Sequence, residues 1–362
     1  MATPTSRFTR RTLLAAAAAA PAAVKGADAI KLPKKLRLGL IGFQGHPNLV
    51  VGPLNKFPDI EVVAMQDNSK EVLARQARNP RLAAARQYAD YNEMLAKEEL
   101  DLVSINNNNG ERAAAVISAA KRKINVIAEK PLAINRADYI TVRKTVEANK
   151  ISLGLLLNMR YLPEYLAIRK VVSEGLVGDV GQIAGQKSYV AGRRDKWYRT
   201  KETYGSTMLW IGPHLVDLMR FGSGRDLVEV SANRAHIGFP DLEDMDNVSC
   251  ALFKLDNGGA GTLRIDYFRT ESAGSHEDSR LRIAGTKGIV EWQDSTGVTL
   301  MTQDLKPHKL PELPPEGSVF HDYIEGTYLG KPRSLTIEDI WRVNDIVITA
   351  HEAADAGKIL RT

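Results

Sequence analysis

Residues 36–47 read Leu36-Arg-Leu-Gly-Leu-Ile-Gly42-Phe-Gln44-Gly45-His-Pro47, an apolar run followed by closely spaced glycines. Pro47 is tolerated at the start of a helix, where its missing N–H would be unpaired anyway. In a strand-to-helix turn of this kind glycine lets the backbone approach a phosphate, and the helix N-terminus supplies free N–H groups. Gly42 fits the first glycine of G-x-G-x-x-G, whereas Gln44 and Pro47 hold the other two positions and Gly45 falls between them. The stretch therefore predicts a dinucleotide-binding turn.

Short apolar runs alternate with segments of helical periodicity from Leu36 to about Asn158. Buried strands that alternate with helices are typical of a doubly wound parallel sheet. We therefore predict an α/β Rossmann domain over residues 30–158. Its expected strands are Leu36–Phe43, Ile60–Asp67, Asp101–Asn106, Ile124–Ala128 and Ser152–Asn158, and its expected helices include Glu111–Lys121 and Arg136–Asn149.

Asp67 supports this interpretation of the turn, because it ends the second strand 25 residues after Gly42. An acidic residue near this position accepts hydrogen bonds from the adenosine ribose hydroxyls of a bound dinucleotide. A carboxylate there repels a 2′-phosphate, so NAD is the expected cofactor and NADP is disfavoured. The alternative is that Asp67 is a solvated residue at a strand end.

Residues 159–362 have a different pattern, which predicts a second, α+β domain for substrate binding and oligomerisation. Several short alternating runs between Leu227 and Met301 predict a mostly antiparallel sheet with one face covered and the other open or paired. The lone cysteine, Cys250, lies in one of these runs and is expected to be buried. The expected helices are Glu164–Glu174, Ser206–Phe221, Val319–Glu325 and Ile337–Ala356.

Residues 1–29 are interpreted as an export signal and not as part of the fold. The twin-arginine pattern Thr9-Arg10-Arg11-Thr12-Leu13-Leu14 precedes an alanine-rich run and the cleavage-like Ala27-Asp28-Ala29. The alternatives are a membrane anchor or a disordered basic tail, but an apolar run of about 11 residues is too short to span a bilayer, which needs roughly 20. We predict export by the twin-arginine machinery to the periplasm or beyond, with no membrane anchor.

Composition narrows the function classes. The 362 residues are 44% hydrophobic and 25% charged, and the formal net charge is +6. Half of that charge comes from residues 1–29, and the remaining basic residues are scattered. No zinc-finger or similar motif is present, so we expect neither nucleic-acid binding nor a metal site.

The motif Ala128-Glu129-Lys130-Pro131-Leu132 resembles the glucose–fructose oxidoreductase/inositol dehydrogenase (Gfo/Idh/MocA) family, whose members carry E-K-P after a Rossmann strand. The resemblance continues in order along residues 36–362. Its further pieces are Tyr88-Ala-Asp-Tyr91, Asn158-Met-Arg160-Tyr161, Gly175-Leu-Val-Gly178-Asp-Val-Gly181, Gly212-Pro-His214-Leu-Val-Asp217, Gly285-Thr-Lys-Gly288 and Ala353-Ala-Asp-Ala-Gly357.

The resemblance implies an NAD-dependent oxidoreductase that acts on a hydroxyl-bearing carbon of a sugar, glycoside or cyclitol. It implies that Lys130 lies beside the nicotinamide and that His214 transfers protons. Relatives pair through the open face of the second sheet, which implies a homo-oligomer. The cofactor-binding residues expected are Gly42, Gln44, Gly45, Asp67, Asn107, Asn109, Glu129 and Lys130, and the substrate-binding residues expected are Arg160, Tyr161, Trp197, Trp210 and Asp217.

The chain departs from the family pattern at three places. Asn107-Asn108-Asn109 replace a T-P-N-type segment, Arg112 holds a histidine position, and Trp210 replaces an aspartate. Trp210 is expected to stack on a sugar or to belong to the core. We expect one of two roles for the nearby arginines Arg193, Arg194 and Arg199: they bind a carboxylate or phosphate of the ligand, or they face water. Two further functions stay open: a glycoside hydrolase or lyase that recycles a tightly bound NAD, and a non-catalytic binding protein.

Overall fold

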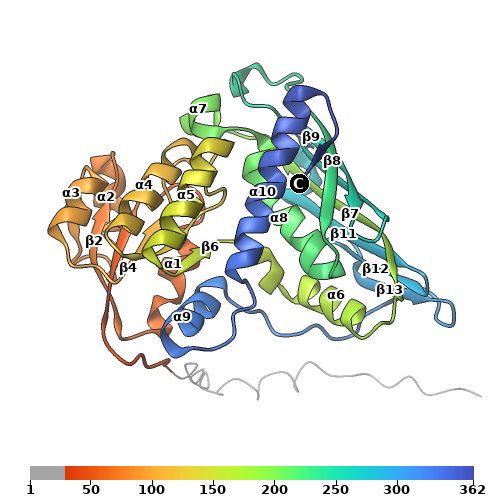
Figure 1. Cartoon of the computed structure of the whole chain (residues 1–362), viewed down its shortest axis with the longest axis horizontal. Coiled ribbons are helices and arrows are strands. Elements are labelled where there is room, and N and C mark those ends of the chain that lie inside the picture. Colours follow the sequence, from red (N-terminus) through yellow and green to blue (C-terminus); the bar gives the residue numbers. More distant parts are fainter. Residues whose placement is uncertain (1–28) are drawn as a thin grey trace, which may run out of the picture.

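The computed structural model describes residues 29–362, in which two sheets lie side by side with helices between and around them (Figure 1). The predicted export signal lies outside the described residues, apart from its last residue, Ala29. Among the described residues, no helix combines the length and the apolar character that crossing a membrane requires.

The N-terminal sheet has the strand order β3-β2-β1-β4-β5-β6, and all of its strand pairs are parallel. This confirms the predicted Rossmann sheet. From β1 the chain adds β2 and β3 on one side of the sheet, and it then adds β4, β5 and β6 on the other side. In such sheets ligands bind outside the carboxyl ends of the strands at the point where the strand order reverses, here between β1 and β4. The strands are β1 (Leu36–Ile41), β2 (Ile60–Gln66), β3 (Arg86–Tyr88), β4 (Leu102–Ile105), β5 (Asn125–Ala128) and β6 (Leu153–Leu155).

The helices of this domain begin at side-chain caps in most cases. Asn108 and Asn135 cap the two long helices by accepting hydrogen bonds from Glu111 N and Asp138 N. The helix after the glycine turn is a single turn without a side-chain cap, and it continues as a 3-10 helix. The elements are α1 (Asn48–Val51), η1 (Gly52–Lys56), α2 (Lys70–Gln76), α3 (Tyr91–Lys97), α4 (Asn109–Lys121) and α5 (Arg136–Asn149).

The C-terminal sheet has the order β14-β13-β12-β11-β7-β10-β9-β8-β15, in which only β7 and β10 pair in parallel. The predicted mostly antiparallel sheet is confirmed. The strands are β7 (Val180–Val190), β8 (Leu227–Ala235), β9 (Val248–Leu255), β10 (Ala260–Arg269), β11 (Glu277–Gly285), β12 (Gly288–Gln293), β13 (Gly297–Thr302), β14 (His308–Lys309) and β15 (Leu360–Arg361).

One face of this sheet is covered by helices, and the other is open. The covering helices are α6 (Pro163–Ser173), α8 (Thr207–Ser223) and α10 (Ile337–Ala356), which contact strands from β7 to β12 (Figure 1). The short elements η2 (Asn158–Tyr161), η3 (Lys196–Tyr198) and α7 (Lys201–Tyr204) lie on the chain before α8, and η4 (Pro240–Leu242) and η5 (Glu271–Ala273) join strands.

The prediction that Cys250 is buried is wrong. In β9 the residues Ser249, Ala251, Phe253 and Leu255 are buried, whereas Cys250 is exposed on the open face. Side chains alternate between the two faces of a strand, so the more apolar set of alternate positions takes the covered face and leaves the cysteine on the other.

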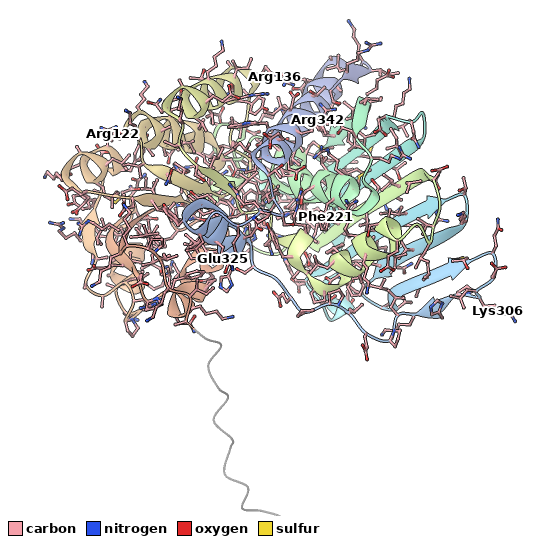
Figure 2. All side chains as sticks on the ribbon, turned by 60° about the horizontal axis from the view of Figure 1, so that its bottom comes forward. Arg122, Arg136, Phe221, Lys306, Glu325 and Arg342 are labelled. Carbon is pink, nitrogen blue, oxygen red and sulfur yellow. The ribbon has the colours of Figure 1, made fainter. Side chains whose placement is uncertain are left out.

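The C-terminal half returns to the N-terminal domain through α9 (Val319–Leu329). Phe320 packs edge-to-face on Phe57 with ring centroids 5.6 Å apart, and the Tyr323 hydroxyl donates to Ser152 O at 3.2 Å. Arg136 at the start of α5, which is labelled in Figure 2, forms ion pairs with Asp345 and Glu352 of α10. The two domains therefore contact each other both through α9 and through the ion pairs between α5 and α10.

Candidate active site

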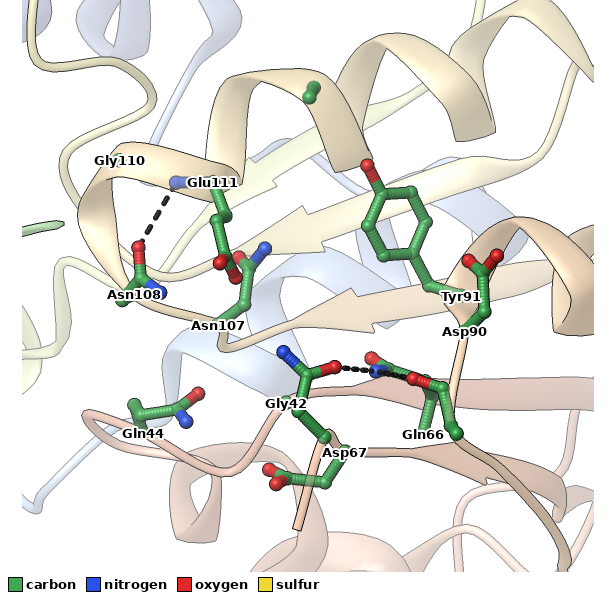
Figure 3. Close-up of a pocket in the computed structure, with 13 residues that line it drawn as sticks. Gly42, Gln44, Gln66, Asp67, Asp90, Tyr91, Asn107, Asn108, Gly110 and Glu111 are labelled. Atoms are coloured by element: carbon green, nitrogen blue, oxygen red, sulfur yellow. Dashed lines mark hydrogen bonds between the residues drawn. The ribbon is translucent and has the colours of Figure 1, made fainter. Parts of the chain in front are cut away.

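A crevice of about 540 Å³ lies at the carboxyl ends of the N-terminal strands, at the reversal between β1 and β4 (Figure 3). Of the residues predicted to bind the cofactor, it brings together Gly42, Gln44, Asp67 and Asn107. Gly45, Asn109, Glu129 and Lys130 do not line this crevice, although Lys130 lines the neighbouring cavity described below.

Glycine is required twice in the turn that follows β1. Gly42 and Gly45 have φ values of +71° and +69°, a region that side chains disfavour. A Cβ atom at Gly42 would lie 2.6 Å from the backbone N of Asn107, and one at Gly45 would lie 2.7 Å from Glu129 Oε2. Gly42 thus lets β1 and β4 converge, and Gly45 makes room for a buried carboxylate.

Polar atoms without partners surround the crevice. Asp67 accepts a hydrogen bond from Ser69 N through Oδ1 at 2.8 Å, but its buried Oδ2 has no partner within residues 29–362. Both side-chain polar atoms of Asn107 and the Oε1 atom of Gln44 are also buried without partners in this part of the chain. Because buried polar atoms are rarely left unpaired, these atoms fit a bound polar ligand such as a dinucleotide.

Glu129 is a buried carboxylate that reaches back to the glycine turn. Its Oε2 accepts hydrogen bonds from His46 N at 2.8 Å and lies 2.7 Å from His46 Nδ1. Burial alone would raise the pKa of Glu129, but His46, Lys130 and Arg112 lower it to about 2. The charged Glu129 therefore fixes His46 and occupies one backbone amide of the turn.

Lys130 follows Glu129 at the carboxyl end of β5 and is 1% exposed. Its Nζ donates to Trp210 O at 2.7 Å, lies 3.2 Å from the centroid of the Trp210 ring and is 3.9 Å from Glu129 Oε1. Burial lowers the pKa of Lys130 to about 7, although Glu129 opposes this shift. The amine is therefore able to give up and accept a proton near neutral pH.

A second cavity, of about 280 Å³, lies between the domains next to Lys130. Side chains from both halves of the chain line it, including several from the C-terminal sheet. Those with chemistry relevant to a ligand are His46, Lys130, Lys187, Arg194, Trp210 and His214. The two residues predicted to be catalytic, Lys130 and His214, are thus brought together here.

His214 lies on α8 and is 6% exposed. Its Nδ1 atom is buried and has no hydrogen-bond partner within the described part of the chain. Burial, and then the charges of Lys130 and Lys187, hold the pKa of His214 well below its usual range. The ring is therefore neutral at physiological pH and can donate or accept a hydrogen bond.

Trp210 forms one wall of this cavity, but it is only 4% exposed. His46 stacks on it with ring centroids 5.9 Å apart, and Trp197 meets it edge-on at 5.2 Å. Trp197 does not itself line the cavity. Trp210 therefore supports Lys130 and His46, and the sugar-stacking role of Trp210 and Trp197 stays a prediction.

Three residues predicted to bind substrate lie away from this cavity. Arg160 donates to Asp217 Oδ2 at 2.9 Å and to Ser334 O at 2.6 Å, and all of these contacts are buried or partly buried. Burial would lower the pKa of Arg160, but Asp217 and Asp339 raise it above its ordinary value. The Tyr161 hydroxyl donates to Asp322 Oδ2 at 2.8 Å. These side chains join η2 to the helices and do not reach Lys130.

Sequence reasoning gave no role to three residues that shape the site. Arg112 is fully buried and joins the loop after β4 to the E-K-P segment by donating to Asn109 Oδ1 at 2.9 Å and Pro131 O at 2.8 Å. His46 and Lys187 line the cavity. The sequence could have indicated that Lys187 is buried, because it occupies the same alternate positions of β7 as Ile183 and Gly185, which lie on the covered face.

Comparisons with known proteins agree with this geometry. The model described as "Oxidoreductase family, NAD-binding Rossmann fold" matches residues 36–155, and "GFO/IDH/MocA C-terminal domain" matches residues 165–291. Myo-inositol 2-dehydrogenase of Thermotoga maritima is 22% identical over 271 residues, which cover 74% of this chain and 78% of that protein.

Solved structures share the fold over most of the chain. A putative oxidoreductase from Thermotoga maritima superposes with a TM-score of 0.84 and 28% identity, covering 90% of this chain and 100% of that one. A levoglucosan dehydrogenase in complex with NADH gives a TM-score of 0.77 at 20% identity, covering 90% of this chain and 98% of that one.

Proposed function

We propose that this chain, which belongs to the GFO/IDH/MocA oxidoreductase family, transfers a hydride between NAD and a hydroxyl-bearing carbon of a sugar, glycoside or cyclitol. The observation that carries the proposal is Lys130, a buried amine with a pKa of about 7 that faces a cavity beside the Rossmann crevice. The names of the inositol and levoglucosan dehydrogenases among the similar proteins support a polyhydroxylated substrate.

The crevice residues would hold the cofactor. Asp67 would accept hydrogen bonds from the ribose hydroxyls through its Oδ2, which has no partner among the described residues, and the turn at Gly42 together with Asn107 would hold the pyrophosphate. When bound, NAD supplies a nicotinamide that accepts or returns a hydride.

Lys130 acts as the base during oxidation. The uncharged amine accepts the proton of the substrate hydroxyl as the C–H bond is broken, and the resulting ammonium is stabilised by Glu129 at 3.9 Å and by the Trp210 carbonyl at 2.7 Å. In the reverse direction the ammonium returns that proton to the carbonyl oxygen.

His214 orients the same hydroxyl. Because its ring is neutral and its buried Nδ1 lacks a partner within residues 29–362, it can hydrogen-bond a substrate oxygen without competing for the proton that Lys130 takes. Burial excludes water from the Lys130 amine and lowers its pKa.

The direct test is a turnover panel on full-length protein, following reduced nicotinamide with NAD and neutral, acidic and cyclic polyols. We expect steady reduction of NAD by at least one compound, and we expect mass spectrometry of denatured protein to identify NAD as the dinucleotide that binds. Failure to bind any dinucleotide in either redox state would exclude the proposal.

We also propose that the protein acts outside the cytoplasm as a homo-oligomer. The twin-arginine pattern at Arg10 and Arg11 supports export. Apolar side chains on the open face of the C-terminal sheet support self-association, since Leu252 and Ile359 are 56% and 70% exposed. Light scattering of purified protein at several concentrations measures this, and a monomer throughout would contradict it.

A further inference from the structure

Arg194 is a charged side chain in the wall of the cavity that contains Lys130 and His214. The two lysines of that wall have carboxylate partners, because Lys130 lies 3.9 Å from Glu129 and Lys187 lies 2.8 Å from Glu277. Among the ion pairs of residues 29–362, none includes Arg194. Its guanidinium is therefore a permanent positive charge of the cavity wall that has no carboxylate within ion-pair distance among the described residues.

The chain holds this guanidinium in a fixed place. Its Nη2 donates to Val190 O at 2.8 Å, and its central carbon lies 4.8 Å from the ring centroid of Tyr267 and 5.6 Å from that of Tyr198. The Nε atom is buried without a partner in this part of the structure. Arginine stacked on aromatic rings is a common arrangement for binding planar anions, because the stacked fork is already oriented.

Arg194 is separated from the reacting centre by aromatic contacts. Tyr198, whose ring lies near the Arg194 guanidinium, meets Trp210 edge-on with ring centroids 6.0 Å apart. The Lys130 amine in turn lies over the Trp210 ring. A ligand that touches both Arg194 and Lys130 must therefore carry its negative group on a different carbon from the one that reacts.

We infer that the substrate is a sugar acid whose carboxylate is bound by Arg194 while a ring hydroxyl lies at Lys130 and His214. This inference rests on the proposed function, which it narrows from polyols in general to those that carry a carboxylate. A guanidinium without an ion-pair partner among the described residues matches one negative charge, and a planar carboxylate matches the planar guanidinium in two parallel hydrogen bonds.

The test compares three matched groups of ligands on full-length protein: the hexuronates glucuronate and galacturonate, the neutral hexoses glucose and galactose, and the 6-phosphates of those hexoses. For wild type we expect kcat/KM to be about tenfold to one-hundredfold higher for a hexuronate than for its hexose, the range of one charge-assisted hydrogen bond. A preference for hexose phosphates or for neutral hexoses would overturn the inference.

Arg194→Gln should reduce the ratio of hexuronate to hexose kcat/KM by about tenfold to one-hundredfold. Arg194→Lys keeps the positive charge but loses the planar guanidinium, so its ratio of hexuronate to hexose kcat/KM should lie between those of wild type and Arg194→Gln. Lys196→Gln is the control, because Lys196 is an exposed cation of η3 outside the cavity, and it should leave the ratio unchanged. An unchanged ratio in Arg194→Gln would overturn the inference.

Calorimetric titration with glucuronate, in the presence of NAD, separates this inference from the proposed function. Binding that is lost in Arg194→Gln without any turnover in wild type would uphold the carboxylate site and reject the oxidoreductase activity. Turnover of neutral polyols together with no hexuronate binding would uphold the activity and reject the carboxylate site. Thermal melting of each variant verifies that the fold is intact.

Discussion

Lys130 combines burial, a lowered pKa and a place at the end of a Rossmann strand. Replacing it with methionine keeps the buried volume but removes the proton acceptor. We expect Lys130→Met to lower kcat by about 10²- to 10⁴-fold, the usual contribution of a positioned acid–base group. Lys121→Met, an exposed lysine of α4, is the control and should retain full activity. A loss below tenfold in Lys130→Met would contradict the assigned role.

The pH dependence of the reaction follows from the same amine. Below its pKa of about 7 Lys130 is protonated and cannot accept the hydroxyl proton, so kcat/KM for oxidation should rise with pH up to about 7 and then level off. In the reduction direction the ammonium is the active form, so the rate should fall above about 7. Glu129, with its pKa of about 2, and His214, with its pKa well below its usual range, do not titrate there.

The measurement is kcat/KM against pH in both directions. If kcat/KM for oxidation instead fell as the pH rose toward 7, Lys130 would not be the base.

We expect Asp67 to determine which dinucleotide is preferred. Its buried Oδ2 has no partner among the described residues, so it is available to a ribose hydroxyl, and its charge disfavours a 2′-phosphate. We expect Asp67→Ser to weaken NAD binding by about tenfold or more, the cost of one hydrogen bond to a charged group, and to raise the relative use of NADP. Titration of protein fluorescence with each dinucleotide measures this.

Glu61→Gln, an exposed residue earlier in the same strand, is the control for that experiment. Equal NAD affinity in wild type and Asp67→Ser would show that Asp67 does not bind the dinucleotide.

At the scale of elements, the buried pair Arg160–Asp217 holds η2 against α8, with side chains 2% and 1% exposed. Asp217→Asn leaves the buried guanidinium without its main counter-charge. We expect a loss of about 3 kcal/mol in the free energy of unfolding, measured in urea. The exposed pair Glu93–Lys97 on α3 offers the control, because Glu93→Gln should cost about 1 kcal/mol or less. Equal losses in the free energy of unfolding for the two variants would show that the buried Arg160–Asp217 pair stabilises the fold no more than an exposed pair does.

Much of the element pattern could be predicted because it depends on local periodicity. The strand around Leu36 and the helix Arg136–Asn149 follow directly from apolar spacing. Alternation alone did not say which face of β9 is covered, so Cys250 was placed on the wrong side. The roles of Arg160 and Asp217 could not be predicted, because their contacts with Ser334 and Asp339 join segments far apart in sequence.

The candidate site was predictable where a motif carried it. Lys130 and His214 come from separate domains, yet the E-K-P and G-P-H segments predicted both, and they line one cavity. Lys187, Arg194 and Tyr267 come from the C-terminal sheet or the loop after β7, and their meeting with Lys130 depends on how the two domains pack. No spacing within the sequence encodes that arrangement.

At the scale of the whole molecule, the arrangement of domains places the cavity where both contribute side chains. The proposed export route carries folded protein, which would suit a chain that binds its dinucleotide before it leaves the cytoplasm. We expect Arg10→Lys combined with Arg11→Lys to retain the protein in the cytoplasm, as cell fractionation and immunoblotting would show. Normal export of this double variant, with Lys25→Gln as control, would contradict the twin-arginine assignment.

The central claim is that hydride passes between NAD held at Asp67 and a substrate held at Lys130. Stopped-flow absorbance of reduced nicotinamide, on NAD-loaded protein mixed with a hexuronate or a neutral polyol, tests it in one turnover. We expect a rapid rise approaching one equivalent of reduced cofactor per chain for wild type and almost none for Lys130→Met. An NAD-loaded wild-type protein that binds these compounds but never produces reduced nicotinamide would contradict it.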